Sequence, residues 1–390
     1  MIGAGVFAAV GPAAGAAGWG MLGGLALAGV VAYANATSSA QLAAVYPEAG
    51  GTYAYARQVL NPFWGFLAGW GFIAGKTASL AAMAFTVGAY SFPGASRLVA
   101  IGTVVTMTAI NYSGIRKTAF ATRVIVAVVL ATLAVAVTTS FSAASFKPDF
   151  APTSGGFPGI LQAAALLFFA FAGYARIATL GEEVVEPKRV IPRAIPLALA
   201  ITLAVYLLVA VAALTAIGPE TLAESDAPLA TAAMASGWPG AGTVVRAGAV
   251  VAACGVLLSL LAGVSRTMFA MARQRELPSL LATVHPRFQT PHLAELLIGL
   301  LVILVVSVGD LRGAVGFSSF TVLGYYAIAN VCAWRQPPQE RRFPRWLAPV
   351  GVLGCLLLAF ALPAGTVIAG LTVFVAGALV WFLRSKFVSG

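Results

Sequence analysis

Charged side chains are scarce in this sequence. Asp, Glu, Lys and Arg together make up 9% of the 390 residues, whereas apolar residues make up 60%. Soluble domains carry about 25% charged and about 45–50% apolar residues, so this composition excludes a soluble globular protein. A net charge of +11 would suggest nucleic acid in a soluble chain, but here the basic residues fall in short gaps between long apolar runs. We therefore expect a protein of the lipid bilayer with no nucleic-acid partner.

Cysteine and histidine are also rare. Cys254, Cys332 and Cys355 all lie inside apolar runs, which excludes a disulfide framework and a zinc site with closely spaced ligands. His285 and His292 flank one loop and add no metal-ligand pattern. The amino terminus has no basic leader and no small-residue cleavage site, so we expect no signal peptide. We also expect no metal and no cofactor.

Twelve apolar segments follow one another along the chain. Each must be a helix, because backbone groups in hydrocarbon need internal partners and the alternating pattern of a closed barrel is missing. A helix over the first segment would be only about 18 Å long, whereas the hydrocarbon core of a bilayer is about 30 Å thick. We therefore expect either that the first residue of this sequence lies inside a longer gene, or that the chain is a fragment lacking the inner half of helix 1. The segments are 1–12, 19–45, 62–91, 97–112, 118–140, 158–181, 194–217, 241–272, 292–309, 313–334, 346–362 and 364–384.

The positions of Lys and Arg predict the orientation of these helices. If residue 1 starts on the cytoplasmic side, seventeen basic residues fall in the inner loops and tail. Only Arg97, Lys147, Arg246 and Arg312 then lie outside. This predicts a multi-pass protein of the cell (inner) membrane with both termini in the cytoplasm.

Glycines open the chain and suggest a break in the first helix. In the run Ile2, Gly3, Ala4 and Gly5, the glycines let a membrane helix unwind at little cost, so that free backbone N–H groups can meet a substrate carboxylate. Glycines are frequent in this chain, however, and in membrane helices they often serve close packing. Both interpretations stay open from these residues alone.

Five stretches of sequence carry a family resemblance. Residues 168–176 are rich in aromatics and run into a loop, residues 181–193, with the pattern Glu-Glu-x-x-x-Pro and a second Pro followed by Arg. Residues 46–53, 265–278 and 285–292 agree in order and spacing. The chain resembles the amino acid-polyamine-organocation transporter superfamily over nearly its whole length.

The resemblance implies an all-α membrane protein of the LeuT-type fold. Helices 1–5, in residues 1–140, and helices 6–10, in residues 158–334, would form two inverted repeats. Helices 11 and 12, in residues 346–384, would be peripheral. In this fold substrates bind at broken helices near the midplane of the bilayer.

The same resemblance implies a substrate site made from the breaks in helices 1 and 6. Exposed N–H and C=O groups there would hold the carboxylate and ammonium of an amino acid, and aromatic side chains would shape the pocket. The alternative for each aromatic is packing against helices or lipid. The implied substrate-binding residues are Ile2, Gly3, Ala4, Gly5, Phe169, Phe171, Ala172, Gly173 and Tyr174.

Two basic residues within the spans are candidates for coupling or gating. Lys76 lies at the centre of segment 62–91, and we expect no acidic residue within a spanning segment to neutralise it. A charge at that depth is costly and usually functional, so Lys76 could carry a proton; the alternative is a structural lysine that snorkels or stays neutral. Arg176 could gate the site, pair with Glu182 or Glu183, or contact substrate.

Neutral polar side chains also interrupt the apolar segments. Asn35, Ser38, Ser39 and Ser259 could line a pathway, but hydrogen bonding between helices is the commoner use of such residues and is favoured here.

The predicted function is secondary active transport of amino acids or related amines by alternating access. Proton-coupled symport is favoured and exchange is the alternative. Three departures from the family pattern bear on the coupling ion: Gln41 and Ala175 stand where many members carry acidic residues, and Lys117 lies before helix 5 rather than within it. An enzyme would need clustered acid, base, nucleophile or metal ligands, which the spans lack. A channel would be expected to show a ring of charges or a filter loop, and neither is visible.

Overall fold

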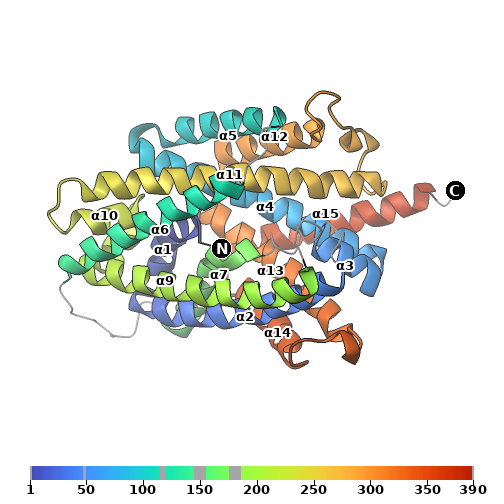
Figure 1. Cartoon of the computed structure of the whole chain (residues 1–390), viewed down its shortest axis with the longest axis horizontal. Coiled ribbons are helices and arrows are strands. Elements are labelled where there is room, and N and C mark those ends of the chain that lie inside the picture. Colours follow the sequence, from blue (N-terminus) through green and yellow to red (C-terminus); the bar gives the residue numbers. More distant parts are fainter. Residues whose placement is uncertain (1, 47–49, 115–118, 145–154, 175–185, 389–390) are drawn as a thin grey trace.

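The computed structural model describes residues 2–46, 50–114, 119–144, 155–174 and 186–388, and all regular structure in these ranges is helical. Most helices run along the long axis of the molecule, and the chain begins near its middle (Figure 1). The longer helices are α2 (Met21–Val45), α4 (Pro62–Ser91), α5 (Ser96–Tyr112), α6 (Ala119–Ser142), α9 (Pro187–Glu224), α11 (Ala241–Arg273), α13 (Leu311–Arg335) and α15 (Ala364–Val388). The shorter ones are α1 (Gly5–Ala17), α3 (Thr52–Val59), α7 (Gly156–Phe171), α10 (Pro228–Met234), α12 (His292–Val308) and α14 (Leu347–Phe360).

Eight stretches of the described chain are helical, long and apolar enough to cross a membrane. The first of them joins α1 and α2, and α7, α12 and α14 are shorter apolar helices. Each of the twelve predicted segments overlaps one of these helices, while twelve separate crossings stay a prediction. The chain is therefore a multi-pass, all-helical membrane protein.

Several helix boundaries differ from the predicted ones; the first helix, expected at 1–12, is Gly5–Ala17. In the segment expected at 158–181, α7 ends at Phe171 and a 3₁₀ turn, Ala172–Tyr174, follows; residues 175–181 lie outside the described part of the chain. The segment expected at 194–217 begins earlier, at Pro187, because a proline is tolerated in the first turn of a helix. Its predicted end agrees with the structure: the backbone is non-helical at Gly218, and a further helical stretch then runs to Glu224.

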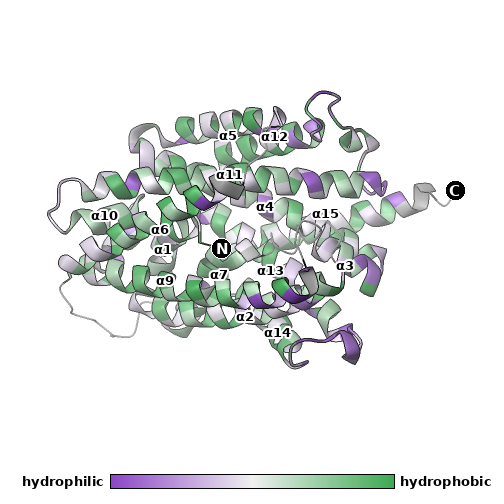
Figure 2. Cartoon of the chain, viewed as in Figure 1, coloured by the Kyte–Doolittle hydropathy of each residue, from purple (hydrophilic) through white to green (hydrophobic). Residues whose placement is uncertain are grey.

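Burial shows which helices lie at the centre. In the apolar window of α4, 94% of residues are buried, against 78% in α13 and 11% in α15, so α4 and α13 form the core and α15 is peripheral. Hydrophilic residues gather at one end of the molecule, around α3, the loop after α11 and the loop before α14 (Figure 2). We call this the α3 end and the opposite one the α10 end.

Candidate functional site

The start of α1 and the end of α7 meet inside the molecule. Gly5, the first residue of α1, packs so closely that a Cβ atom placed on it would lie 2.7 Å from the Cα of Ala170. Any side chain at this position would force the two backbones apart. Because the ends of helices leave backbone N–H and C=O groups without intrahelical partners, this contact brings free polar backbone groups together at the start of the chain, near the middle of the bundle (Figure 1).

Tyr206 of α9 links these two helix ends. Its hydroxyl donates a hydrogen bond of 3.1 Å to the carbonyl oxygen of Ala170 and has the backbone of Gly3 as a second hydrogen-bond neighbour. The ring lies 5.3 Å, centroid to centroid, from that of Phe171. Sequence reasoning missed Tyr206, although a tyrosine inside a long apolar run carries a hydroxyl that must find a polar partner when buried.

The predicted aromatic residues occupy different environments. Phe171 is fully buried against Tyr206, whereas Phe169 keeps 9% of its surface exposed. On the other side of the contact, the Phe7 ring packs edge-on against Tyr90 of α4 at 5.8 Å, and the Tyr90 hydroxyl donates to the Phe7 carbonyl at 3.3 Å. Both predicted phenylalanines are thus buried, and Phe171 packs against Tyr206 at the helix end.

The remaining predicted residues surround the same contact. Ala4 and Ala172 are buried, Ile2 and Gly3 are partly buried, and Gly173 is exposed. The backbone of Tyr174 belongs to the 3₁₀ turn, and its side chain lies outside the described part of the chain. Arg176, Glu182 and Glu183 also lie outside the described residues. The structure thus brings the two predicted stretches together, and their role in binding stays a prediction.

Lys76 lies elsewhere, at the interface of α4 with α13. It is 5% exposed, and the same face of α4 carries Phe72, whose ring lies 5.2 Å from that of Tyr325, and Ser79, whose hydroxyl lies 2.6 Å from that of Ser318. Tyr90, which reaches α1, is fourteen residues further along α4, about 21 Å at 1.5 Å per residue. Lys76 therefore lies about four turns along α4 from the residue that reaches α1.

The expectation that no acidic residue lies within a spanning segment is wrong. Glu295 lies in the first turn of α12, where the positive end of the helix dipole favours it, and is only 3% exposed. Its carboxylate interacts with Arg266 and Ser265 of α11. The longer α9 also contains Glu220 and Glu224, both exposed at the α10 end. Among the described residues, Glu295 therefore has a positive charge near it, that of Arg266 on the neighbouring helix α11.

A buried carboxylate, Glu276, joins α3 to the loop after α11. Glu276 is 3% exposed and accepts hydrogen bonds from Arg57 and, at 2.8 Å, from the hydroxyl of Tyr53. Burial raises the pKa of Tyr53, so the hydroxyl stays protonated and remains a donor at neutral pH. Sequence reasoning missed this group because Glu276 is 219 residues from Arg57 and 223 from Tyr53, and the interaction leaves no local pattern.

The chain thus forms a bundle of helices long and apolar enough to cross a membrane, in which the start of α1 lies against the end of α7. The chain belongs to the amino acid permease family: the family model described as amino acid permease matches residues 1–383.

Three relatives of this chain are named as transporters or permeases. An uncharacterised transporter of Mycobacterium bovis is 56% identical over 388 residues, covering 98% of this chain and 88% of the relative. The branched-chain amino acid permease of Bacillus subtilis is 27% identical, covering 99% of this chain and 90% of the relative. Human cationic amino acid transporter 4 is 31% identical, covering 85% of this chain and 56% of the relative.

Proposed function

We propose that this protein is a secondary active transporter of amino acids or related amines that works by alternating access. The observation that carries the proposal is the contact between the start of α1 and the end of α7, held by Tyr206. Within the proposed LeuT-type fold, residues 1–140 and 158–334 are inverted repeats, and residues 346–384 are peripheral. The two meeting helix ends would be the corresponding breaks of the two repeats.

We propose a cargo with a free carboxylate and a free ammonium group. Free N–H groups at the start of α1 suit the carboxylate, and free carbonyl groups at the end of α7 suit the ammonium. The described residues that surround the contact carry no carboxylate, so a substrate with a basic side chain is disfavoured. The relatives named for branched-chain and cationic amino acids support the amino acid class and leave the side chain to experiment.

Uptake into proteoliposomes tests this proposal. Labelled amino acids, amines, sugars and nucleobases are offered separately, with a pH gradient, a sodium gradient or neither. Uptake of amino acids or amines that is driven by the pH gradient supports symport, and uptake that needs cargo on both sides supports the exchanger alternative. Absence of amino acid and amine uptake, exchange and binding across the panel would overturn the proposal.

We propose that Lys76 is the proton carrier. A buried lysine without a carboxylate partner among the described residues is costly when charged, so its charge state can respond to a conformational change that alters its hydration. Lys76→Met removes the charge and Lys76→Arg makes it permanent, so both variants are expected to lose uptake driven by the pH gradient while substrate binding persists. If Lys76→Met keeps the wild-type pH profile of uptake, the lysine is structural.

A further inference from the structure

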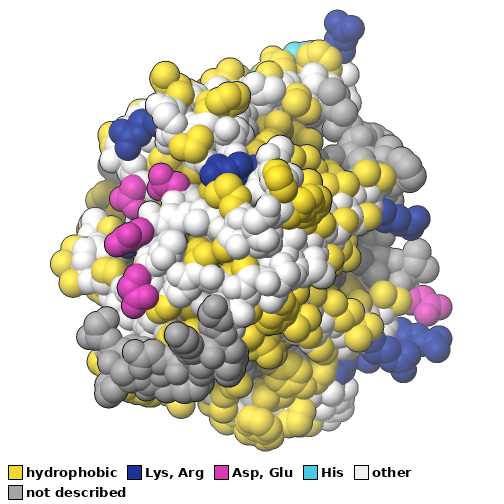
Figure 3. Space-filling model, turned by 90° about the vertical axis from the view of Figure 1, so that its left-hand side faces the viewer, with side chains coloured by type: hydrophobic (Ala, Val, Ile, Leu, Met, Phe, Trp, Pro, Cys, Tyr) yellow, Lys and Arg dark blue, Asp and Glu magenta, His cyan; other side chains and the backbone are white. Residues whose placement is uncertain are grey.

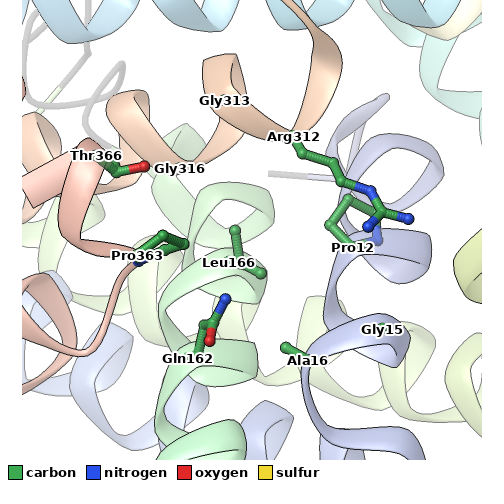
Figure 4. A pocket seen from close by; sticks show the side chains of 10 residues that line it. All are labelled: Pro12, Gly15, Ala16, Gln162, Leu166, Arg312, Gly313, Gly316, Pro363 and Thr366. Atoms are coloured by element: carbon green, nitrogen blue, oxygen red, sulfur yellow. The ribbon is translucent and has the colours of Figure 1, made fainter.

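A cavity opens at the α10 end of the bundle, apart from the α1–α7 contact. Its volume is about 350 Å³, and it lies between α1, α7, α13 and the start of α15. The side chains that determine its chemistry are Pro12, Gln162, Leu166, Arg312 and Thr366 (Figure 4). This volume is at the lower end of the roughly 300–1,000 Å³ of small-molecule sites.

The cavity lies along the same two helix faces as the α1–α7 contact. Pro12 is seven residues after Gly5, and Leu166 is four residues before Ala170, so helical periodicity places each pair on one face. Along α1 the separation is about 10 Å at 1.5 Å per residue. The cavity and the contact therefore lie along the same side of α1, about two turns apart.

Arg312 gives the cavity its charge. One guanidinium nitrogen donates to the carbonyl oxygen of Ala223, and the other terminal nitrogen faces α1, 3.8 Å from where a Cβ on Gly15 would lie. Figure 4 shows this group reaching from α13 toward Pro12. A guanidinium has five N–H donors, so donors remain for a ligand. Within the described ranges, no carboxylate lies within ion-pair distance of Arg312.

The surrounding charges favour a zwitterion over a simple anion. Acidic side chains gather on the face of the molecule at this end (Figure 3). The exposed acidic residues there are Glu220, Glu224, Asp226 and Asp310. They attract an ammonium group and repel a phosphate or a lipid headgroup with net negative charge. We propose that the cavity is an outer site that binds the carboxylate of a free amino acid through Arg312 and Gln162 before it reaches the α1–α7 contact; this rests on the proposed function.

The test compares uptake by Arg312→Gln and Gln162→Leu with uptake by Arg97→Gln. Arg97 is a matched control because it is exposed at the same end and is held by the carbonyl oxygens of Ser307 and Gly309, away from the cavity. Labelled leucine, alanine and arginine are offered separately to proteoliposomes of phosphatidylcholine, with or without phosphatidylglycerol. The initial rate is measured against external concentration at low and high salt.

We expect Arg312→Gln to raise KM about tenfold, the effect of one charge-assisted hydrogen bond, and Gln162→Leu to raise it about threefold, with the maximal rate within about twofold of wild type. Arg312→Lys should lie between Arg312→Gln and wild type. The difference between Arg312→Gln and wild type should shrink at high salt, because Arg312 is exposed.

Several outcomes separate this inference from the proposed function. If wild type transports but KM is unchanged in both cavity variants, the outer site is wrong and the transporter proposal stands. An equal change in Arg97→Gln indicates a general surface-charge effect, and a change seen only with phosphatidylglycerol indicates a lipid headgroup; either result overturns the outer site. If loss of the Ala223 contact prevents Arg312→Gln from folding, Gln162→Leu decides. Wild-type protein that neither transports nor binds amino acids contradicts both proposals.

Discussion

Gly5 and Tyr206 determine, between them, how two helix ends can meet in the middle of this protein. Gly5 contributes by having no side chain, which lets the backbone of α1 approach Ala170. Tyr206 contributes a hydroxyl that satisfies a carbonyl group at the end of α7. The glycine was recognisable in the sequence because it belongs to an opening Gly-x-Gly run, whereas the tyrosine has no motif around it.

Replacing Gly5 by valine should abolish transport and leave membrane insertion intact. The first carbon of the new side chain would lie 2.7 Å from the Cα of Ala170, so the helix ends must separate, at about 1–3 kcal/mol for such overpacking. Gly102→Val on α5 is the control, because a Cβ atom there meets nothing within 4 Å. Uptake and thermal unfolding are measured for both variants, and wild-type transport by Gly5→Val would remove this contact from the site.

Tyr206→Phe should slow transport while preserving the fold. The change removes one hydroxyl and leaves the carbonyl of Ala170 without that donor, which costs about 1 kcal/mol. Tyr33→Phe, at a tyrosine that is 42% exposed, is the control and should match wild type. Equal transport rates in the two variants would show that Tyr206 only fills space.

At the scale of elements, α3 is the segment whose attachment depends most on polar contacts. It is only eight residues long, too short to be stable alone, and it is held through Glu276 after α11 and through Tyr325 of α13, whose hydroxyl accepts a hydrogen bond from the Thr52 N–H at 3.0 Å. A helix of this length takes its position from its neighbours rather than from its own propensity.

Glu276→Gln should destabilise the protein by about 1–3 kcal/mol, less than the loss of a fully buried pair, because Arg57 is 27% exposed. The matched control is Glu186→Gln, which removes an exposed pair with Arg189 at 3.9 Å and should change stability by less than about 0.5 kcal/mol. Thermal unfolding in detergent measures both. Equal melting temperatures for the two variants would contradict a stabilising role for Glu276.

For the whole molecule, the asymmetry of charge between the two ends predicts how it sits in the membrane. Arg57, the loop after α11 and the loop before α14 place basic residues at the α3 end, where the hydrophilic segments gather (Figure 2). Positively charged loops remain in the cytoplasm, so we expect the α3 end, toward which α15 runs, to be cytoplasmic (Figure 1).

Cysteine labelling tests this orientation. In a variant whose three cysteines are replaced by alanine, a single cysteine is introduced as Ser279→Cys at the α3 end or as Asp226→Cys at the α10 end; both positions are exposed. A membrane-impermeant maleimide added to intact cells should label only Asp226→Cys, and permeabilised cells should show both. Labelling of Ser279→Cys from outside would reverse the topology.

The sequence alone determined that this is a helical membrane protein and an amino acid permease. Long apolar runs require helices, because a backbone in hydrocarbon must satisfy its own hydrogen bonds. The family motifs are short stretches of neighbouring residues, so they can be recognised without a structure. Hydrogen bonding between helices was also predicted correctly for Asn35, whose side-chain oxygen accepts from Asn330 at 2.6 Å.

Only the tertiary structure decided which polar groups meet. Tyr206 and Ala170 are 36 residues apart, and Arg57 and Glu276 are 219 apart. It also placed Lys76 at the interface of α4 with α13 and Glu295 against α11. The hydropathy of a segment depends only on the residues that follow one another in it, so it can be calculated from the sequence. A hydrogen bond between helices depends on their rotation, depth and crossing, which are set by close packing of all the helices together.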